Sequence, residues 1–417
     1  MSSSSSSSSS SKKASYEILA DERDSLAFTL KNVDVSVANA LRRTMITDIR
    51  SVVIDVDTCV FEKNNGRLHN EILKERLRCI PVHCKEDMET WAKNHYIDVE
   101  VSNGTDDFVY VTTANFRVMR RLRGSEAGDD SGAAEEEGER ERVFPKNEFK
   151  NYIDFARLGP FIHENIVPES LQFRADFAVK TARENACYSV VSKCSYKNTP
   201  DVALAAEEWG RREEILRRDL ASNGGENEDR IRERVEFEKR DFYHLDAQRF
   251  FVPRQFDFIV ETVGVFSPLD IVLKAFISLQ NTCVDFRAKL RDVPETMIFL
   301  SGGMKDYSNM ENSYDVLFYG AESSLGHILC QRVYDAHSVV VVSERDNEKG
   351  EDEKNLVDIC TFKKFHPHDD YYVLRLKFHE KTNPTQIANL LIDHVIAMAE
   401  QFKTLYHLFG GSGSGSN

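Results

Sequence analysis

The stretch VETVGVF at residues 260–266, followed by SPLD at 267–270, spells a small structural unit that occurs twice in this chain. The second version is YVLRLKF at 372–378, followed by NPTQ at 383–386. In each version an alternating run precedes a Ser or Asn that suits a helix N-cap, a Pro that suits the first helical position, and a third-position residue that completes a capping-box pattern. Each version therefore predicts a strand, a capped turn and a helix.

Apolar stripes at helical spacing follow both turns. One stripe alone is as typical of an ordinary core-facing helix as of a dimerisation helix. Two matched strand–cap–stripe units instead predict a dimerisation unit that the chain carries twice, so that it pairs with itself. The interface residues expected on these late helices are Leu269, Val272, Phe276 and Leu279 in the first and Ile387, Leu391, Val395, Met398 and Phe402 in the second.

The repeat extends upstream to an earlier helix in each unit. Residues 36–50 predict a helix with Val37, Leu41 and Met45 on one face. LGHIL at 325–329 takes the same place in the second unit, with Leu325 and Leu329 on its apolar face. Each unit is thus expected to read strand, helix, strand, late helix, and the two units are expected to pack around a pseudo-two-fold axis.

Composition bounds the class of protein. With 417 residues, 41% of them hydrophobic, the chain is expected to hold two or three soluble domains. A net charge of −15 disfavours direct, non-specific binding to nucleic acid. No run of 18 apolar residues and no secretory signal predict a protein without membrane association. Eight cysteines without a Cys-x-x-Cys pair argue against a zinc or iron–sulfur site and predict reduced thiols inside a cell.

The expected fold class is α+β, with an inserted, mostly-β domain. An acidic, Gly- and Ala-containing loop is expected at 124–142, and two exposed Glu/Arg-rich helices at 203–240. The expected division is a Ser-rich tail at 1–15, a discontinuous dimerisation domain at 16–82 and 251–300, an insert at 83–250, a second dimerisation module at 312–409, and a flexible tail at 410–417.

FTLKNVDVSVANALRRTM at 28–45 resembles the signature of the alpha-like subunits of multisubunit RNA polymerases, which are bacterial alpha, archaeal D and the third-largest subunit of eukaryotic RNA polymerase II. The similarity continues through the strand at 52–56 and a short helix that ends in Ile80-Pro81. It departs at Glu75-Arg76, where the family usually has a histidine before the arginine. NACYSVV at 185–191 resembles the family's aromatic-Ser-Pro-Val loop with Val190 in place of the proline.

Residues 312–409 resemble the small partner of that alpha-like polypeptide, archaeal L or the eleventh subunit of RNA polymerase II. SLGH at 324–327, FHPH at 365–368 and the late helix carry this likeness. In the family these are separate chains that heterodimerise, so the resemblance implies that they are fused here. Such a fusion suggests a divergent system, and a large DNA virus is our hypothesis for its origin.

The resemblance implies a role for the arginines of the early helix. A lone Arg-Arg is more often a solvated helix face, but in the family arginines here dock the large catalytic subunits. The expected docking residues are Asn39, Arg42, Arg43, Glu75 and Arg76. The implied partners are the largest and second-largest polymerase subunits and the small zinc-binding subunits, with DNA reached only through the complex.

Other chemistry is not expected. Asp55 and Asp57 suit an exposed strand face better than a metal site, and His327, His366 and His368 are more typical of loop or surface histidines. No phosphate-binding loop, nucleophile elbow or zinc-protease motif occurs, so we expect no cofactor and no catalytic site. Cys59 and Cys360 are expected to act as buried small hydrophobes.

These features favour a non-catalytic assembly platform of a DNA-directed RNA polymerase. A stand-alone scaffold or transcription-regulating protein that uses the same fold is the alternative, and an enzyme of unseen type is a third. The assembly platform predicts large polymerase subunits in stoichiometric amounts, whereas the stand-alone scaffold predicts a free or homo-oligomeric protein. The expected location is the nucleus or a cytoplasmic viral factory, and packaging in the virion stays open.

Overall fold

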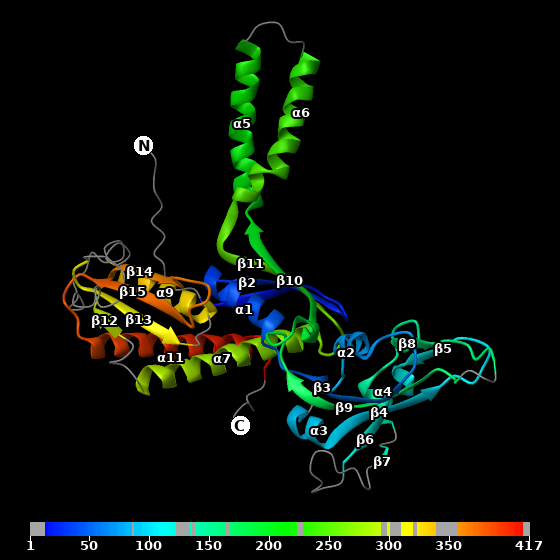
Figure 1. The fold of residues 1–417 in the computed structure, drawn as a ribbon. Coiled ribbons are helices and arrows are strands. Elements are labelled where there is room, and N and C mark those ends of the chain that lie inside the picture. Colours follow the sequence, from blue (N-terminus) through cyan, green and yellow to red (C-terminus); the bar gives the residue numbers. More distant parts are fainter. Residues whose placement is uncertain are drawn as a thin grey trace.

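A computed structural model describes residues 13–85, 87–121, 134–135, 138–163, 167–222, 228–292, 298–300, 310–319, 323–338 and 357–411. The Ser-rich tract, residues 301–309, the charged loop at 343–355 and the tail from residue 412 lie outside them. The chain forms two strand–helix units, an inserted domain and a projecting helical hairpin (Figure 1).

The first unit is a four-stranded antiparallel sheet with two helices. The strand order is β1-β2-β11-β10. The elements are β1 (Ser15–Asp21), β2 (Ser25–Lys31), β10 (Val191–Pro200), β11 (Phe251–Thr262), α1 (Val35–Thr47) and α7 (Pro268–Asp292).

The second unit repeats this arrangement. Its sheet has the order β12-β13-β15-β14. The elements are β12 (Ile298–Leu300), β13 (Ser313–Tyr319), β14 (Val357–Lys363), β15 (Tyr371–Phe378), α9 (Ser323–His337) and α11 (Pro384–Leu408).

The caps expected from the sequence fix where both late helices begin. Asn383 accepts from the Thr385 amide, and the Gln386 side chain accepts from the Asn383 amide, which completes a capping box. Ser267 and Asp270 make the same reciprocal pair at the start of α7. Each cap satisfies amides that a helix leaves without a partner at its first turn. The predicted capped turns are therefore confirmed.

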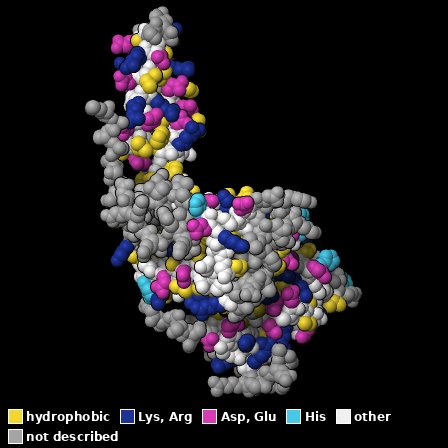
Figure 2. Space-filling model, turned by 90° about the vertical axis from the view of Figure 1, so that its left-hand side faces the viewer, with side chains coloured by type: hydrophobic (Ala, Val, Ile, Leu, Met, Phe, Trp, Pro, Cys, Tyr) yellow, Lys and Arg dark blue, Asp and Glu magenta, His cyan; other side chains and the backbone are white. Residues whose placement is uncertain are grey.

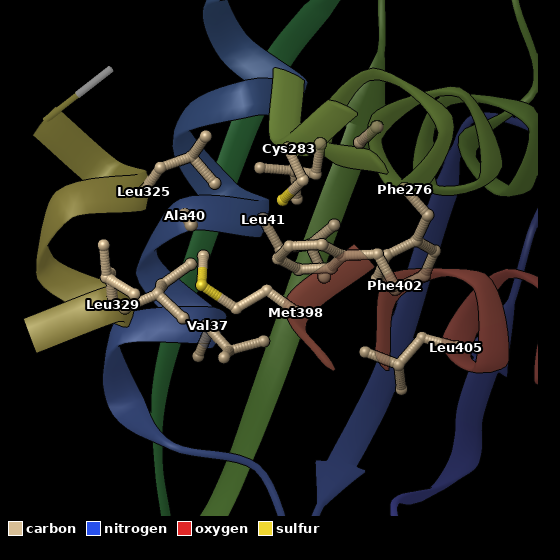
Figure 3. Packing of buried hydrophobic residues seen from close by; sticks show 14 of the residues in the cluster. Val37, Ala40, Leu41, Phe276, Cys283, Leu325, Leu329, Met398, Phe402 and Leu405 are labelled. Carbon is tan, nitrogen blue, oxygen red and sulfur yellow. The ribbon is translucent and has the colours of Figure 1, made fainter. Parts of the chain in front are cut away.

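One hydrophobic core joins the two units. The long helices α7 and α11 lie side by side (Figure 1). Side chains of α1, α7, α9 and α11 converge in this core, with Leu41, Phe276, Leu329 and Phe402 among them (Figure 3). Both units would therefore expose their main apolar faces to solvent if they were taken apart.

The inserted domain has its own core. A five-stranded sheet, β3-β9-β4-β6-β7, and a two-stranded sheet, β5-β8, enclose it with three short helices. The elements are β3 (Ser51–Asn64), α2 (Asn70–Arg78), α3 (Met88–Asn94), β4 (His95–Ser102), β5 (Val109–Thr112), β6 (Arg117–Arg120), β7 (Ala134–Glu135), α4 (Glu139–Val143), β8 (Asp154–Leu158) and β9 (Ser170–Lys180).

Packing divides the chain at other places than the expected boundaries at 82 and 250. β3 and α2 belong with the insert, because Val52 and Ile54 of β3 and Leu77 of α2 lie in its core. β10 belongs with the first unit, because it pairs with β11. The end of the expected acidic loop forms the helical turn α4, while 124–133 and 136–137 lie outside the described residues.

Two antiparallel helices project from the end of the β10–β11 ribbon (Figure 1). They are α5 (Val202–Ser222) and α6 (Glu228–His244), as the charge pattern predicted. A small cluster of Trp209, Val235 and Phe242 holds them together.

Candidate docking surface

The arginines of α1 are held in two different ways. The Asn39 side-chain oxygen accepts from Arg42 Nε and Nη2, at 3.2 and 3.0 Å, so the amide fixes the plane of a half-buried guanidinium. Arg43 is exposed. Asn39 and Arg42 lie one helical turn apart, which places both on one face of α1.

Each arginine also influences a neighbouring element. Burial raises the pKa of the Cys194 thiol on β10 to about 12, and the Arg42 charge opposes that rise. Burial and then the Arg43 charge lower the pKa of His327 on α9. α1 contacts both β10 of the first sheet and α9 of the second unit, so the two arginines lie on the helix where the two units meet.

Glu75 and Arg76 lie on a separate element. Arg76 donates from Nε to the Phe155 carbonyl at 2.7 Å and from Nη2 to the Asp154 carbonyl at 3.1 Å, which ties α2 to β8. Glu75 is exposed and accepts from Arg78 at 2.7 Å. The five expected docking residues are therefore divided between the first unit and the insert.

A charged cluster beside α2 was missed from the sequence. Lys180 Nζ lies 3.0 Å from Asp55 and 3.7 Å from Asp57, and Arg78 lies 3.8 Å from Asp57. Burial would lower the pKa of Lys180, but the hydrogen bond from Lys180 to Asp55 raises it. Burial raises the pKa of the neighbouring Tyr188 hydroxyl. Because β3, α2 and β9 each supply a member, only the fold brings them together.

The residues expected at the intramolecular interface all contact one core. Leu269 is half-buried at its edge and the others are buried. They are Val37, Leu41 and Met45 on α1, Val272, Phe276 and Leu279 on α7, Leu325 and Leu329 on α9, and Ile387, Leu391, Val395, Met398 and Phe402 on α11.

The candidate metal ligands find other partners. Asp55 and Asp57 pair with the cations of the cluster described above. His327 meets the Phe362 ring edge-on, and His368 donates its amide to His366 in the β14–β15 turn. Within the described residues no group of three His, Cys, Asp or Glu side chains could hold a metal ion.

The thiols lie in two close pairs and several buried positions. Cys79 and Cys187 lie 3.9 Å apart at the surface, and Cys330 and Cys360 lie 3.4 Å apart between α9 and β14. Cys59 is buried, as expected, and burial raises its pKa to about 11, whereas Cys360 is only half-buried. Among the described helices, none is long and apolar enough to cross a membrane.

Comparison with known proteins identifies similarities along much of the chain. A family model described as the RNA polymerase Rpb3/Rpb11 dimerisation domain matches residues 27–283. DNA-directed RNA polymerase II subunit rpb3 of Dictyostelium discoideum is 47% identical over 66 residues, which are 16% of this chain and 21% of that protein.

A longer similarity is weaker in identity. The bovine DNA-directed RNA polymerases I and III subunit RPAC1 is 23% identical over 300 residues, which are 66% of this chain and 84% of that protein. DNA-directed RNA polymerase subunit Rpo3 of Pyrococcus furiosus is 42% identical over 66 residues, or 16% of this chain and 24% of that protein. The chain thus spans under a third of two of these three relatives.

Proposed function

The chain belongs to the RNA polymerase Rpb3/Rpb11 dimerisation-domain family, and we propose that it is a non-catalytic subunit of a DNA-directed RNA polymerase on which the large subunits assemble. The observation that carries this proposal is the single core shared by two strand–helix–strand–helix units. Each unit has a matching unit in the same chain, and the two pack against each other. We infer an intramolecular pseudo-dimer that replaces two separate alpha-like subunits.

The α1 surface is the proposed docking site for the large subunits. Asn39 holds the Arg42 guanidinium before any partner arrives, which reduces the entropy that binding would cost. Arg43 on the same helix, and Glu75 and Arg76 on α2 of the insert, are the other proposed docking residues. The proposed partners are the largest and second-largest polymerase subunits and small zinc-binding subunits, and DNA is reached only through them.

The proposed fusion also underlies our hypothesis that the chain comes from a large DNA virus. Transcription would then take place in the nucleus or in a cytoplasmic viral factory.

Purification from the native source tests the proposal. The protein would be recovered through its C-terminal tail and its partners identified by mass spectrometry. Two large subunits in one-to-one amounts, in one large particle, are the expected result. A lone monomer or a homo-oligomer would leave the fold intact and remove the proposed function.

Arg42→Ala should weaken binding of the second-largest subunit. The change removes an oriented cation, and we expect a loss of about 1–3 kcal/mol, which is roughly 5- to 150-fold in affinity. Arg23→Ala is the control, because it removes an arginine whose side chain is 80% exposed in the β1–β2 turn. Co-purification of the second-largest subunit with the Arg42 variant at the wild-type level would contradict the proposed docking site.

A further inference from the structure

The helical hairpin leaves an apolar seam uncovered. Trp209, Val235 and Phe242 are buried between the two helices, but Leu216 and Leu220 of α5, which pack against them, are only partly buried. Phe237 of α6 is 55% exposed. Two antiparallel helices bury only the faces that meet, so apolar residues on the flank stay in contact with solvent. The hairpin therefore presents an open side to a third element.

That side is a groove of about 480 Å³ between the two helices. Leu216, Leu220 and Phe237 line its floor. The rim carries three arginines and one glutamate, which are Arg230, Arg234, Arg240 and Glu233. An apolar floor between two helices suits an amphipathic helix, which would complete a three-helix arrangement.

The charge at the rim indicates what kind of helix fits. Elsewhere on the hairpin, arginines pair with carboxylates one turn away, as Arg217 does with Glu213 and Arg218 with Glu214. Arg234 pairs with Glu238 in the same way. Arg230 and Arg240 have no carboxylate within ion-pair distance among the described residues. The groove thus offers positive charge beside an apolar floor, although the surface of the hairpin as a whole is of mixed charge (Figure 2).

We propose that this groove binds an amphipathic helix of a partner protein, with its apolar face on Leu216, Leu220 and Phe237 and its acidic residues against Arg230 and Arg240. A second copy of the groove would bring arginines against arginines, which disfavours self-association. Nucleic acid would satisfy the arginines but would leave the apolar floor uncovered. The hairpin projects away from both units, so a partner held there does not occupy the α1 surface (Figure 1).

The test uses the full chain and a fluorescent synthetic helix that carries leucines on one face and glutamates beside them. A second peptide has lysine in place of every glutamate. Fluorescence anisotropy should show saturable binding of the acidic peptide and at least about tenfold weaker binding of the basic one, as expected for complementary charge. Phe237→Ala, and separately the double change Arg230→Glu with Arg240→Glu, should each weaken the acidic peptide about tenfold or more.

Matched controls lie on the same hairpin outside the groove. Ile215→Ala removes a 56% exposed side chain, and Arg218→Glu reverses an exposed charge, and both should leave binding unchanged. Circular dichroism would show that every variant keeps its helices. The proposal is overturned if the acidic peptide does not saturate, if both peptides bind alike, or if the groove and control variants behave alike. Arginine-dependent binding of a single-stranded oligonucleotide in preference to the peptide, or hairpin-dependent dimerisation in the ultracentrifuge, would also overturn it.

Discussion

A single glycine sets how closely α9 approaches its sheet. A Cβ on Gly326 would lie 2.0 Å from Cζ of Phe362. That ring cannot swing away without loss, because it stacks on Tyr372 with centroids 5.2 Å apart. Gly326→Ala should therefore destabilise the protein by about 1–3 kcal/mol through overpacking. This exceeds the roughly 0.5–1 kcal/mol that alanine gains over glycine within a helix. Denaturant unfolding would measure the difference.

Gly210 on α5 gives the matched control. Nothing lies within 4 Å of the position its Cβ would take, so Gly210→Ala should stabilise the hairpin rather than destabilise it. The double variant Gly326→Ala with Phe362→Leu replaces the opposing ring by a smaller side chain, so it should recover part of the lost stability. If the two glycine substitutions changed stability in the same direction, steric contact with Phe362 would not be the reason for Gly326.

Between the helices α9 and α11, a pair of histidines makes the second unit sensitive to acid. His337 and His394 lie 3.0 Å apart between their ring Nε2 atoms. Burial, and then the charges of His337 and Arg332, lower the pKa of His394 from 6.5 to about 4, while Asp393 opposes the shift. At pH values between these two pKa values, the unfolded chain therefore carries a proton on His394 that the folded chain does not. The contribution of neutral His394 to the free energy of unfolding is fully present above pH 6.5 and is lost as the pH falls towards 4.

Because His394 is partly exposed, we expect its contribution to this loss to be on the order of 1–2 kcal/mol. His394→Gln removes the titrating group, so the unfolding free energy of the variant should fall less between neutral pH and pH 4 than that of the wild type. The carboxylates titrate alike in both proteins, so the difference between the two curves reports the pair of His394 and His337. Parallel pH curves for the two proteins would contradict the assignment.

The early and late helices of both units were predictable from the sequence because their signals are local. The caps at Asn383 and Ser267 and the stripes behind them lie within a few turns of the residues they organise. Strand partners were not predictable. The alternation of β3 suits the sheet of the first unit and the sheet of the insert equally well, and only its pairing with β9 assigns it to the insert. The same limit hid the contact of Arg76 with β8, whose carbonyl partners lie 78 and 79 residues away.

Across the whole molecule, the shared core predicts that the two units stay together without a covalent link. A protease site placed in residues 293–297, between α7 and β12, would divide the chain while leaving both sheets complete. The fragments should co-elute at the volume of the intact protein, because α7 and α11 bury their apolar faces against each other. Unfolding then becomes bimolecular, so Tm should fall on cutting and should rise with protein concentration, whereas Tm of the uncut chain should not.

Phe402→Asp makes this test more specific. Phe402 is 0% exposed, so the substitution places a charge in the core that both units share. An unpaired buried charge costs several kcal/mol, and in the cut protein this cost falls on the association of the fragments. The cut variant should therefore separate at concentrations where the cut wild type does not. Fragments of the wild-type sequence that separated at micromolar concentration would show that the linker, rather than the core, holds the units together, and the pseudo-dimer would have to be abandoned.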